Sequence, residues 1–253
     1  LDMAPLHANA VYVLELSSYQ LDLVKSLHCD VAVLLNISPD HLDRHGGMKG
    51  YIDAKRRIFL NQQPGDTAVI AVDDTITQTI AMDLATRGGV RVSQVSSEFA
   101  LGRGISAVDG KLYDSLLGNA VRVGDLSEAP TLPGRHNFQN AAAAYAACRS
   151  LGLEPGRIFA AIQMAMGDRV RPGGVDSTAA AHHAIGVVLA EGEHLQRAHR
   201  RAVARPRVAA FVAGRRVLAY RGRTLHHGGA RVGATAAAAR AAARAGAAGA
   251  AGA

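Results

Sequence analysis

The sequence predicts an α/β fold, in which a mostly parallel sheet with flanking helices carries a small antiparallel element and precedes a poorly defined tail. Short apolar runs alternate with segments of helical periodicity, which is typical of βαβ units and a parallel sheet. Farther along the chain, two short patterns with turn signals such as Asp109-Gly110 indicate the antiparallel element. Hydrophobic residues make up 49% of the 253 residues, which is enough for a core in one large or two small domains.

The expected parallel strands are buried apolar runs that precede helices or a chain break. The runs AVYVLEL and VAVLLNI predict the first two strands. Ser38-Pro39-Asp40 ends the second run, because a proline restricts the residue before it. In chain order, the strands are expected at 10–16, 31–37, 68–72 and 90–95, and the helices between them at 19–27, 48–60 and 76–86.

The later part of the ordered sequence predicts the antiparallel element and then two helices. The antiparallel element is expected within 105–123. An Ala-rich helix is expected at 136–151, and Gly152 stands in the position that commonly ends a helix. A shorter helix is expected at 154–166, with Pro155 in its first turn.

The composition changes sharply after Gly167, which sets off the expected tail, 167–253, from the rest of the chain. Residues 1–166 hold 14 basic and 17 acidic side chains, whereas residues 167–253 hold 14 arginines, no lysine and 4 acidic side chains. The tail is therefore either a disordered basic segment or the product of a shifted reading frame in GC-rich DNA, and we favour the second interpretation. A weak strand pattern remains at 207–220, but the sequence suggests no core for it.

Several classes of protein are disfavoured by composition. We expect no membrane association, since no apolar run reaches eighteen residues, and the first residues lack the features of a signal peptide. The missing initiator Met leads us to expect a fragment of a longer protein. Two distant cysteines, Cys29 and Cys148, suit a reducing cytoplasm.

Three polar residues near strand or helix ends are candidates for chemistry. Glu15 ends the first strand, and ligands of open α/β sheets bind beyond the carboxyl ends of strands. His41 follows the second strand and could reach the same edge, where carboxylate and imidazole can ligate a divalent metal. Lys55 would suit a metal site only if it met phosphate or became a carbamate, which is an oxygen-donor anion. A surface glutamate, a loop histidine and a helix lysine remain the alternatives for these positions.

Three blocks together resemble the Mur ligase family. They are ELSSYQL, LNISPDHLDRHGGMKGYIDAKRRIF and LPGRHNFQNAAAAYAA, and their order and separation also agree with the family. The resemblance covers about residues 10–166. It implies that 1–132 is part of a central ATP-binding domain and that 133–166 begins a C-terminal ligase domain.

The resemblance also assigns roles to individual residues. Glu15, His41 and Lys55 match the family's metal site, with Lys55 carbamylated, and His41 and Lys55 would also be catalytic. Asn137 and Asn140 match positions that bind near the base and ribose of the nucleotide. Ser17 and Gln20 lie where the muramoyl-peptide substrate would pass.

The SSYQL variant favours the D-glutamate-adding branch of the family. That branch implies ATP, two Mg²⁺ ions, UDP-N-acetylmuramoyl-L-alanine and D-glutamate, with an acyl phosphate intermediate. A cytoplasmic monomer is expected. The family's phosphate loop, a Gly-Lys-Ser/Thr sequence that cradles the nucleotide phosphates, does not occur in this sequence. We therefore expect the isolated chain to be inactive.

Two alternatives remain open at this point. The first is another ATP-dependent amide ligase, either a different Mur-type enzyme or a folylpolyglutamate-type enzyme of similar fold. The second is a non-catalytic basic protein that binds nucleic acid through its Arg-rich tail, in keeping with the net charge of +7. The second is disfavoured, because no aromatic residues for base stacking are interleaved with the arginines.

Overall fold

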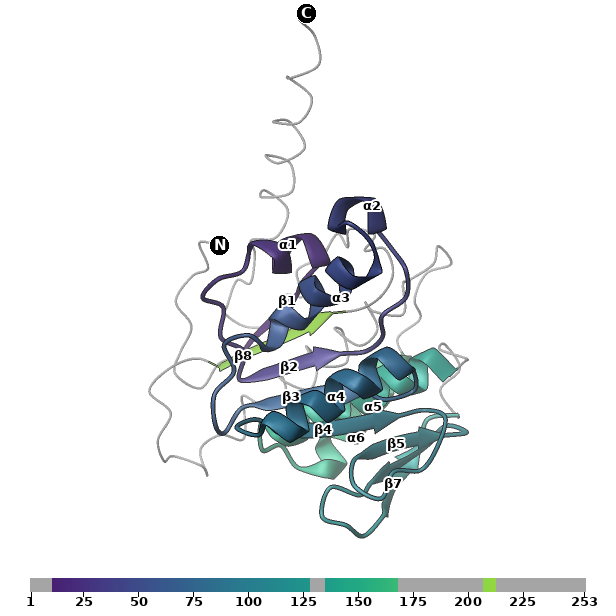
Figure 1. Ribbon diagram of the computed structural model, residues 1–253. Helices are drawn as coiled ribbons and strands as arrows, with labels where there is room; N and C mark the ends of the chain where they lie inside the picture. Colours follow the sequence, from purple (N-terminus) through teal and green to yellow (C-terminus); the bar gives the residue numbers. More distant parts are fainter. Residues whose placement is uncertain (1–10, 128–134, 168–206, 213–253) are drawn as a thin grey trace, which may run out of the picture. The chain divides into compact units, whose positions relative to one another are not determined.

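The computed structural model of the chain describes residues 11–127, 135–167 and 207–212, and these build one eight-stranded mixed sheet flanked by helices (Figure 1). The strand order is β1-β8-β2-β3-β4-β5-β6-β7. Pairing is parallel from β1 to β5 and antiparallel from β5 to β7. This architecture confirms the predicted α/β fold, including its antiparallel element.

The described elements begin and end close to the expected positions. The strands are β1 (Val11–Glu15), β2 (Val31–Leu34), β3 (Thr67–Ala71), β4 (Arg91–Ser96), β5 (Ile105–Val108), β6 (Lys111–Asp114), β7 (Val121–Asp125) and β8 (Arg207–Val212). The helices are α1 (Ser18–Leu23), α2 (Leu42–His45), α3 (Met48–Arg56), the 3₁₀ turn η1 (Arg57–Phe59), α4 (Thr75–Arg87), α5 (Arg135–Ser150) and α6 (Pro155–Gly167).

The first expected helix, 19–27, is shorter in the structure, because the side chain of Arg57 hydrogen-bonds to carbonyl oxygens at its C-terminal end. Val24 is extended, and α1 ends at Leu23. The guanidinium of Arg57 donates to the carbonyl oxygens of Leu21, at 2.8 Å, and of Val24. A long-range contact therefore satisfies groups that would otherwise have continued the helix.

Strand β8 corrects the expectation that the tail contributes no core. Its residues pair in parallel with β1 on one side and β2 on the other, so that Ala209 lies opposite Val13 and Val31. Ala209 and Ala210 are fully buried. The other residues of the predicted segment 207–220, and the rest of the tail, lie outside the described residues.

The two faces of the sheet are covered by different kinds of helix (Figure 1). On one face, the alanines of α5 pack closely on the middle strands, and α6 adds Ile158 and Ile162 to the same core. The other face is covered by α1, α3 and α4 with larger side chains, among them Leu21, Tyr51 and Ile80. Helices α5 and α6 thus share a core with the sheet, while the predicted boundary at 132–133 lies outside the described residues.

Two glycines are required where the structure places them. Gly152 follows α5 with φ +89°, which confirms it as the residue that ends this helix. Gly110 forms the tip of the β5–β6 hairpin with φ +78°. A Cβ atom at Gly110 would lie 2.9 Å from Ser127 and 3.2 Å from the ring of Phe138, so the hairpin passes close to the first turn of α5.

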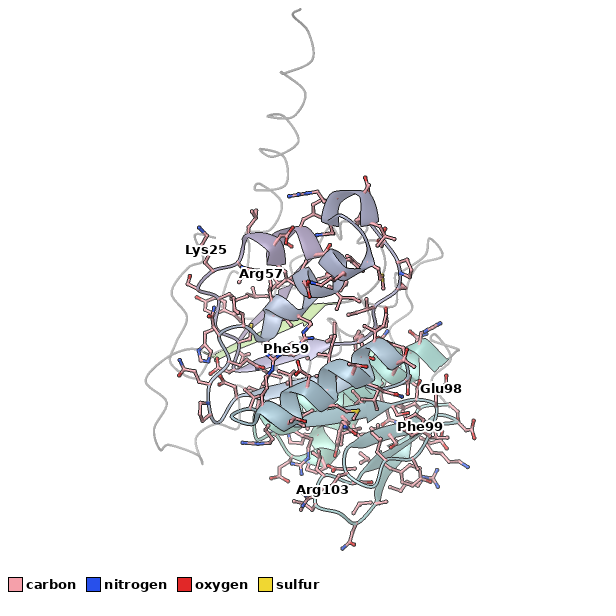
Figure 2. All side chains as sticks on the ribbon, viewed as in Figure 1. Lys25, Arg57, Phe59, Glu98, Phe99 and Arg103 are labelled. Carbon is pink, nitrogen blue, oxygen red and sulfur yellow. The ribbon has the colours of Figure 1, made fainter. Side chains whose placement is uncertain are left out.

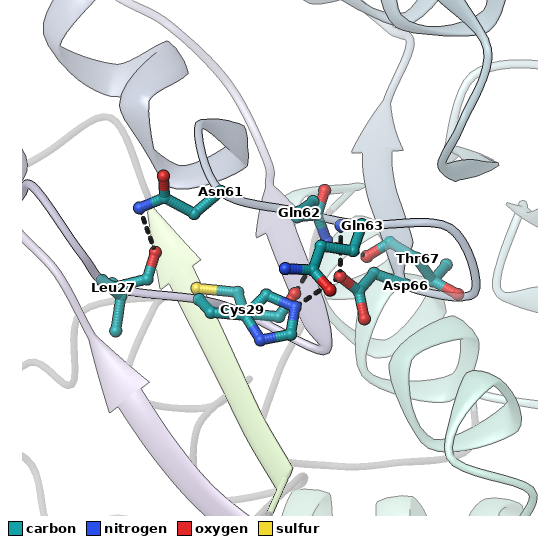
Figure 3. A network of polar contacts seen from close by, with 8 residues as sticks. Leu27, Cys29, Asn61, Gln62, Gln63, Asp66 and Thr67 are labelled. Carbon is teal, nitrogen blue, oxygen red and sulfur yellow. Dashed lines mark hydrogen bonds and ion pairs between the residues drawn. The ribbon is translucent and has the colours of Figure 1, made fainter.

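Polar side chains at the amino edge of β2 and β3 bind one another and nearby backbone groups (Figure 3). Asp66 precedes β3, and its carboxylate lies 2.6 Å from Nε2 of His28 and accepts the backbone N–H of Gln63 at 2.6 Å. The amide of Gln62 donates to the carbonyl oxygens of Cys29 and Thr67. These bonds fasten the loops before β2 and β3 to each other.

Across the described ranges, none of the helices has both the length and the apolar character that a bilayer span requires.

Candidate active site

The candidate residues gather around the carboxyl edge of the sheet, where the parallel strands end. Glu15 is the last residue of β1. His41 lies in the segment after β2, Asp73 follows β3, and Ser96 ends β4. Since parallel strands end at a common edge, all four belong to the part of an open α/β sheet where ligands bind.

Ser17 and Gln20, the predicted substrate contacts, form the N-terminal cap of α1. The Ser17 hydroxyl accepts the backbone N–H of Gln20 at 3.3 Å, and Gln20 Oε1 accepts the backbone N–H of Ser17 at 2.9 Å. This reciprocal capping box fixes the direction in which the chain leaves β1. Their substrate role stays a prediction.

His41 is held in an uncommon backbone conformation at the start of α2. Its φ of +50° and ψ of +34° are left-handed, which costs a non-glycine residue conformational energy. Its Nε2 lies 3.5 Å from a carboxylate oxygen of Asp40, and its ring meets the edge of Tyr19 with centroids 4.9 Å apart. The imidazole is partly exposed, at 39%.

His45 is a residue that the motif assignments did not single out, and it links α2 to α1. Its Nε2 lies 3.1 Å from the Ser18 hydroxyl, its Nδ1 lies 3.4 Å from the Asp22 carboxylate, and its side chain is only 2% exposed. Its ring also lies 5.5 Å from that of Tyr51. Its place at the end of the DHLDRH block was the available signal.

Lys55 is buried on α3 beneath this group of rings. Lys55 is only 1% exposed, and its Nζ lies 5.1 Å from the centre of the Tyr51 ring. Burial lowers the pKa of Lys55 to about 8, against a smaller opposing effect of Asp40. Burial, with Asp40, also raises the pKa of Tyr51 to about 12. About a tenth of a Lys55 amine with this pKa is neutral at pH 7, far more than for an ordinary lysine.

The side chains as they stand do not form a metal site. Within the described residues, no three His, Cys, Asp or Glu side chains are grouped so that they could hold a metal ion. Glu15 and His41 supply only two such ligands, and a charged Lys55 would repel a cation. The donor set therefore suits a metal only if Lys55 is converted into an anion.

The first turns of α5 carry the predicted nucleotide contacts and are fastened to the carboxyl edge. Asn140 is 5% exposed and Gln139 is 7% exposed. The Gln139 amide donates to Asp73 at 2.7 Å, and Asp73 also accepts from Ser96 and Ser97. The motif assignments missed Asp73, although it follows a buried strand just as Glu15 ends one.

The turn after β4 belongs to the same edge. The Ser96 hydroxyl donates to Asp73 and accepts the backbone N–H groups of Glu98 and Phe99, both at 3.1 Å. Figure 2 shows Glu98 and Phe99 together beyond the end of the strand, and Phe99 is 43% exposed.

The sequence matches the Mur ligase middle domain over residues 2–148. It is 58% identical over 153 residues to the UDP-N-acetylmuramoylalanine--D-glutamate ligase of Caulobacter vibrioides strain NA1000, an overlap of 60% of this chain and 32% of that ligase. Ligases of the same name from Phenylobacterium zucineum and Paramagnetospirillum magneticum are 58% identical over 153 residues and 51% identical over 162 residues. Those overlaps cover 60% and 64% of this chain, and 33% and 34% of the two ligases.

Among solved structures, MurF from Acinetobacter baumannii overlaps 78% of this chain and 59% of its own, with 17% identity and a TM-score of 0.36. The chain spans about a third of the length of the curated relatives it matches. Because the middle domain accounts for more than half of the sequence, the chain belongs to the Mur ligase family, as its three sequence blocks predicted.

Proposed function

We propose that this chain is the metal- and nucleotide-binding part of an ATP-dependent ligase that joins D-glutamate to UDP-N-acetylmuramoyl-L-alanine in peptidoglycan precursor synthesis. The observation that carries the proposal is the 58% identity over 153 residues to a ligase of that name. The γ-phosphoryl group of ATP would pass to the substrate carboxylate, which would give an acyl phosphate and release ADP. The amine of D-glutamate would then attack this carbonyl carbon and release phosphate.

Lys55 has the properties that carbamylation needs. Its neutral amine would attack carbon dioxide, a new N–C bond would form as one C=O π electron pair moves onto oxygen, and the nitrogen would release one proton. The pKa of about 8 supports this step, because only the neutral amine is nucleophilic. The product is an anion, which burial and the nearby Asp40 would also disfavour, so its charge would need a bound cation.

Glu15, His41 and a carbamylated Lys55 are the proposed ligands of Mg²⁺, with two ions expected. When bound, such ions offset the repulsion between a carboxylate and a triphosphate. The unmodified side chains do not meet this requirement, so the metal site depends on the carbamate.

The remaining assignments concern binding. Asn137 and Asn140 would contact the base and ribose of the nucleotide, and Ser17 and Gln20 would line the path of the muramoyl-peptide substrate. Their amide and hydroxyl groups can each donate and accept hydrogen bonds, as such contacts require. A cytoplasmic location and a monomeric state complete the proposal.

ATP binding and phosphate release test the proposal in one series. The purified chain should bind ATP in a calorimetric titration with Mg²⁺, and Asn140→Ala should weaken that binding about tenfold or more. With UDP-N-acetylmuramoyl-L-alanine and D-glutamate present, phosphate release should stay at background, since the chain lacks the phosphate loop. A wild-type chain that binds no ATP would contradict the proposed nucleotide site, and turnover by the isolated chain would contradict its predicted inactivity.

A further inference from the structure

We infer that Asp73 is a positioning residue, which fixes the first turns of α5 at the carboxyl edge of the sheet and so places Asn137 and Asn140. The inference deepens the proposed function and rests on it in one respect, namely that these two asparagines contact the nucleotide. Asp73 itself is not assigned a contact with substrate or nucleotide.

The carboxylate of Asp73 accepts four hydrogen bonds from two other elements of the fold. Its Oδ1 accepts the Ser96 hydroxyl at 2.6 Å. Its Oδ2 accepts the backbone N–H of Ser97 at 2.9 Å, the Ser97 hydroxyl at 3.0 Å and the Gln139 amide at 2.7 Å. Hydrogen bonds to a carboxylate are stronger than those between neutral groups, so this one side chain joins the ends of β3 and β4 to α5.

Helix α5 needs such a connection because its packing surface is nearly featureless. Every residue from Ala141 to Ala147 is at most 4% exposed, and all but Tyr145 are alanine. Alanine methyl groups allow the helix to lie close to the sheet, but they offer little resistance to a small rotation or sliding of the helix. Directional polar contacts must therefore supply the register.

Two carboxylates provide these contacts at opposite ends of α5. Near the C-terminal end, Asp114 of β6 accepts the Tyr145 hydroxyl at 3.1 Å and Arg149 Nε at 3.0 Å. Near the N-terminal end, Asp73 holds Gln139. The contacts of Asp73 and Asp114 lie near opposite ends of α5, and together they fix the rotation of the helix and its position along the sheet.

The contact at Gln139 controls the asparagines more directly than the contact at Asp114. Asn140 follows Gln139 in the chain, and Asn137 lies three residues before Asn140 on the same side of the helix. A turn of the helix about its axis would move both amides together. Because ligand geometry tolerates displacements of only about 1 Å, we expect nucleotide affinity to depend on this single carboxylate.

The test compares Asp73→Asn with Asp66→Asn in the full chain. Asp66 is a matched control, because it precedes the same strand and also accepts hydrogen bonds, but its partners in the described part of the chain, His28 and Gln63, lie outside α5. NMR exchange rates of the Gln139 side-chain amide and of the backbone amides of 140–143 report the position of the helix. A calorimetric titration with ATP reports its functional consequence.

With Asp73→Asn, these amide protons should exchange about tenfold faster, and ATP affinity should fall about tenfold or more, as expected for losing a charge-assisted hydrogen bond. Asp66→Asn should change neither quantity. If Asp73→Asn does not fold, Gln139→Ala removes the same contact while leaving Asp73 its serine donors, and it should give the same changes in the backbone amide exchange of 140–143 and in ATP affinity.

Exchange rates and ATP affinity that match those of Asp66→Asn in both variants would overturn the inference. A wild-type chain that binds no ATP would instead contradict the proposed function. In that case, the exchange rates of α5 alone decide whether Asp73 positions the helix.

Discussion

Asp66 and Asp73 stand just outside the opposite ends of β3, and they differ in how far along the chain their contacts reach. Asp66 accepts from the neighbouring turn, at Gln63, and pairs with His28 in the loop before β2 (Figure 3). Asp73 accepts from the end of β4 and from Gln139 on α5. Asp66 therefore joins the loops before two neighbouring strands, whereas Asp73 joins the sheet to a helix on its face.

The two edges also differ in how charge is accommodated. At the amino edge, the polar side chains bind backbone carbonyls and one another, as in the contacts of Gln62 with Cys29 and Thr67. Near the carboxyl edge, Lys55 is almost completely buried and its pKa is lowered. The polar groups of the amino edge thus pair with one another, whereas the Lys55 ammonium near the carboxyl edge is buried at a cost to stability.

The largest expected effect comes from removing both aspartates. Asp73→Ala should lower the free energy of unfolding by about 2–4 kcal/mol, and Asp66→Ala by about 1–3 kcal/mol, because buried donors lose their acceptor. The double variant should lose the sum of the two to within about 0.5 kcal/mol, since the sites are separated by a whole strand. Urea unfolding of the four proteins measures the coupling. A larger coupling would mean that the two edges are not independent.

Replacing Lys55 with Met tests the cost of the buried charge. The folded-state pKa of about 8 lies below the ordinary value, so between pH 8 and 10.5 the unfolded state holds more protons and this group's contribution to stability rises with pH. Below pH 8 the full cost remains. Lys55→Met should therefore be more stable than the wild type at pH 7 by up to about 3 kcal/mol.

The quantity to measure is the difference in free energy of unfolding between wild type and Lys55→Met, because other groups also titrate between pH 8 and 10.5. Burial raises the pKa of Cys29 and Cys148 to about 12, and these thiols lower stability as pH rises above 9. They do so equally in both proteins. The extra stability of Lys55→Met over the wild type, measured by urea unfolding, should shrink from pH 8 to pH 10. A difference that stays constant would argue against deprotonation of the buried Lys55 in this range.

The rates of thiol labelling distinguish local opening of the amino edge from local opening around α5. Cys29 lies in the amino-edge network, and Cys148 lies on α5 near the Asp114 contacts; both are buried. Asp66→Asn should speed the labelling of Cys29 about tenfold and leave Cys148 unchanged, because local opening of one contact exposes only its neighbourhood. Asp114→Asn should do the reverse. Equal acceleration of both thiols by either variant would indicate global unfolding.

The smallest effect is expected for single serines on or after β4. Ser97→Ala removes one side-chain bond to Asp73 and should cost about 0.5–1.5 kcal/mol. Ser93→Ala is the matched control, because its buried hydroxyl has no hydrogen-bond partner in the described part of the chain. That variant should be neutral or slightly stabilising in urea unfolding. A greater loss at Ser93 than at Ser97 would contradict the role given to the Asp73 contacts.

Local pattern was sufficient for most of the sheet and for part of the site. The buried runs that became β1, β2 and β3 have a periodicity that needs no tertiary information. The end of α1 could not be predicted from local pattern. It depends on the hydrogen bond from Arg57 to the carbonyl of Leu21, which lies 36 residues earlier in the chain. The partnership of Asp73 with Gln139 spans 66 residues and leaves no local signature.

The candidate site shows the same limit. Glu15, His41 and Lys55 stood out as candidates by their positions near strand and helix ends, but their roles came from a family resemblance in three blocks and stay predictions. Burial of Lys55 could be expected from its place near the apolar stripe of α3, and its contact with Tyr51 is an (i, i+4) pair within that helix. For β8, the six residues RVAAFV suggested a strand, while their two partners, β1 and β2, could not be deduced from pattern alone.

The position of β8 has a consequence for how the protein is made. Among the described strands, β1 (Val11–Glu15) is synthesised earliest, yet the one described strand that pairs with it is completed at Val212. Until then, one side of β2 presents unpaired backbone N–H and C=O groups, which can recruit a strand from another chain. Of the described strands, an inner one is therefore synthesised last, and the pairing of Glu15 with Phe211 forms only when translation has passed that strand.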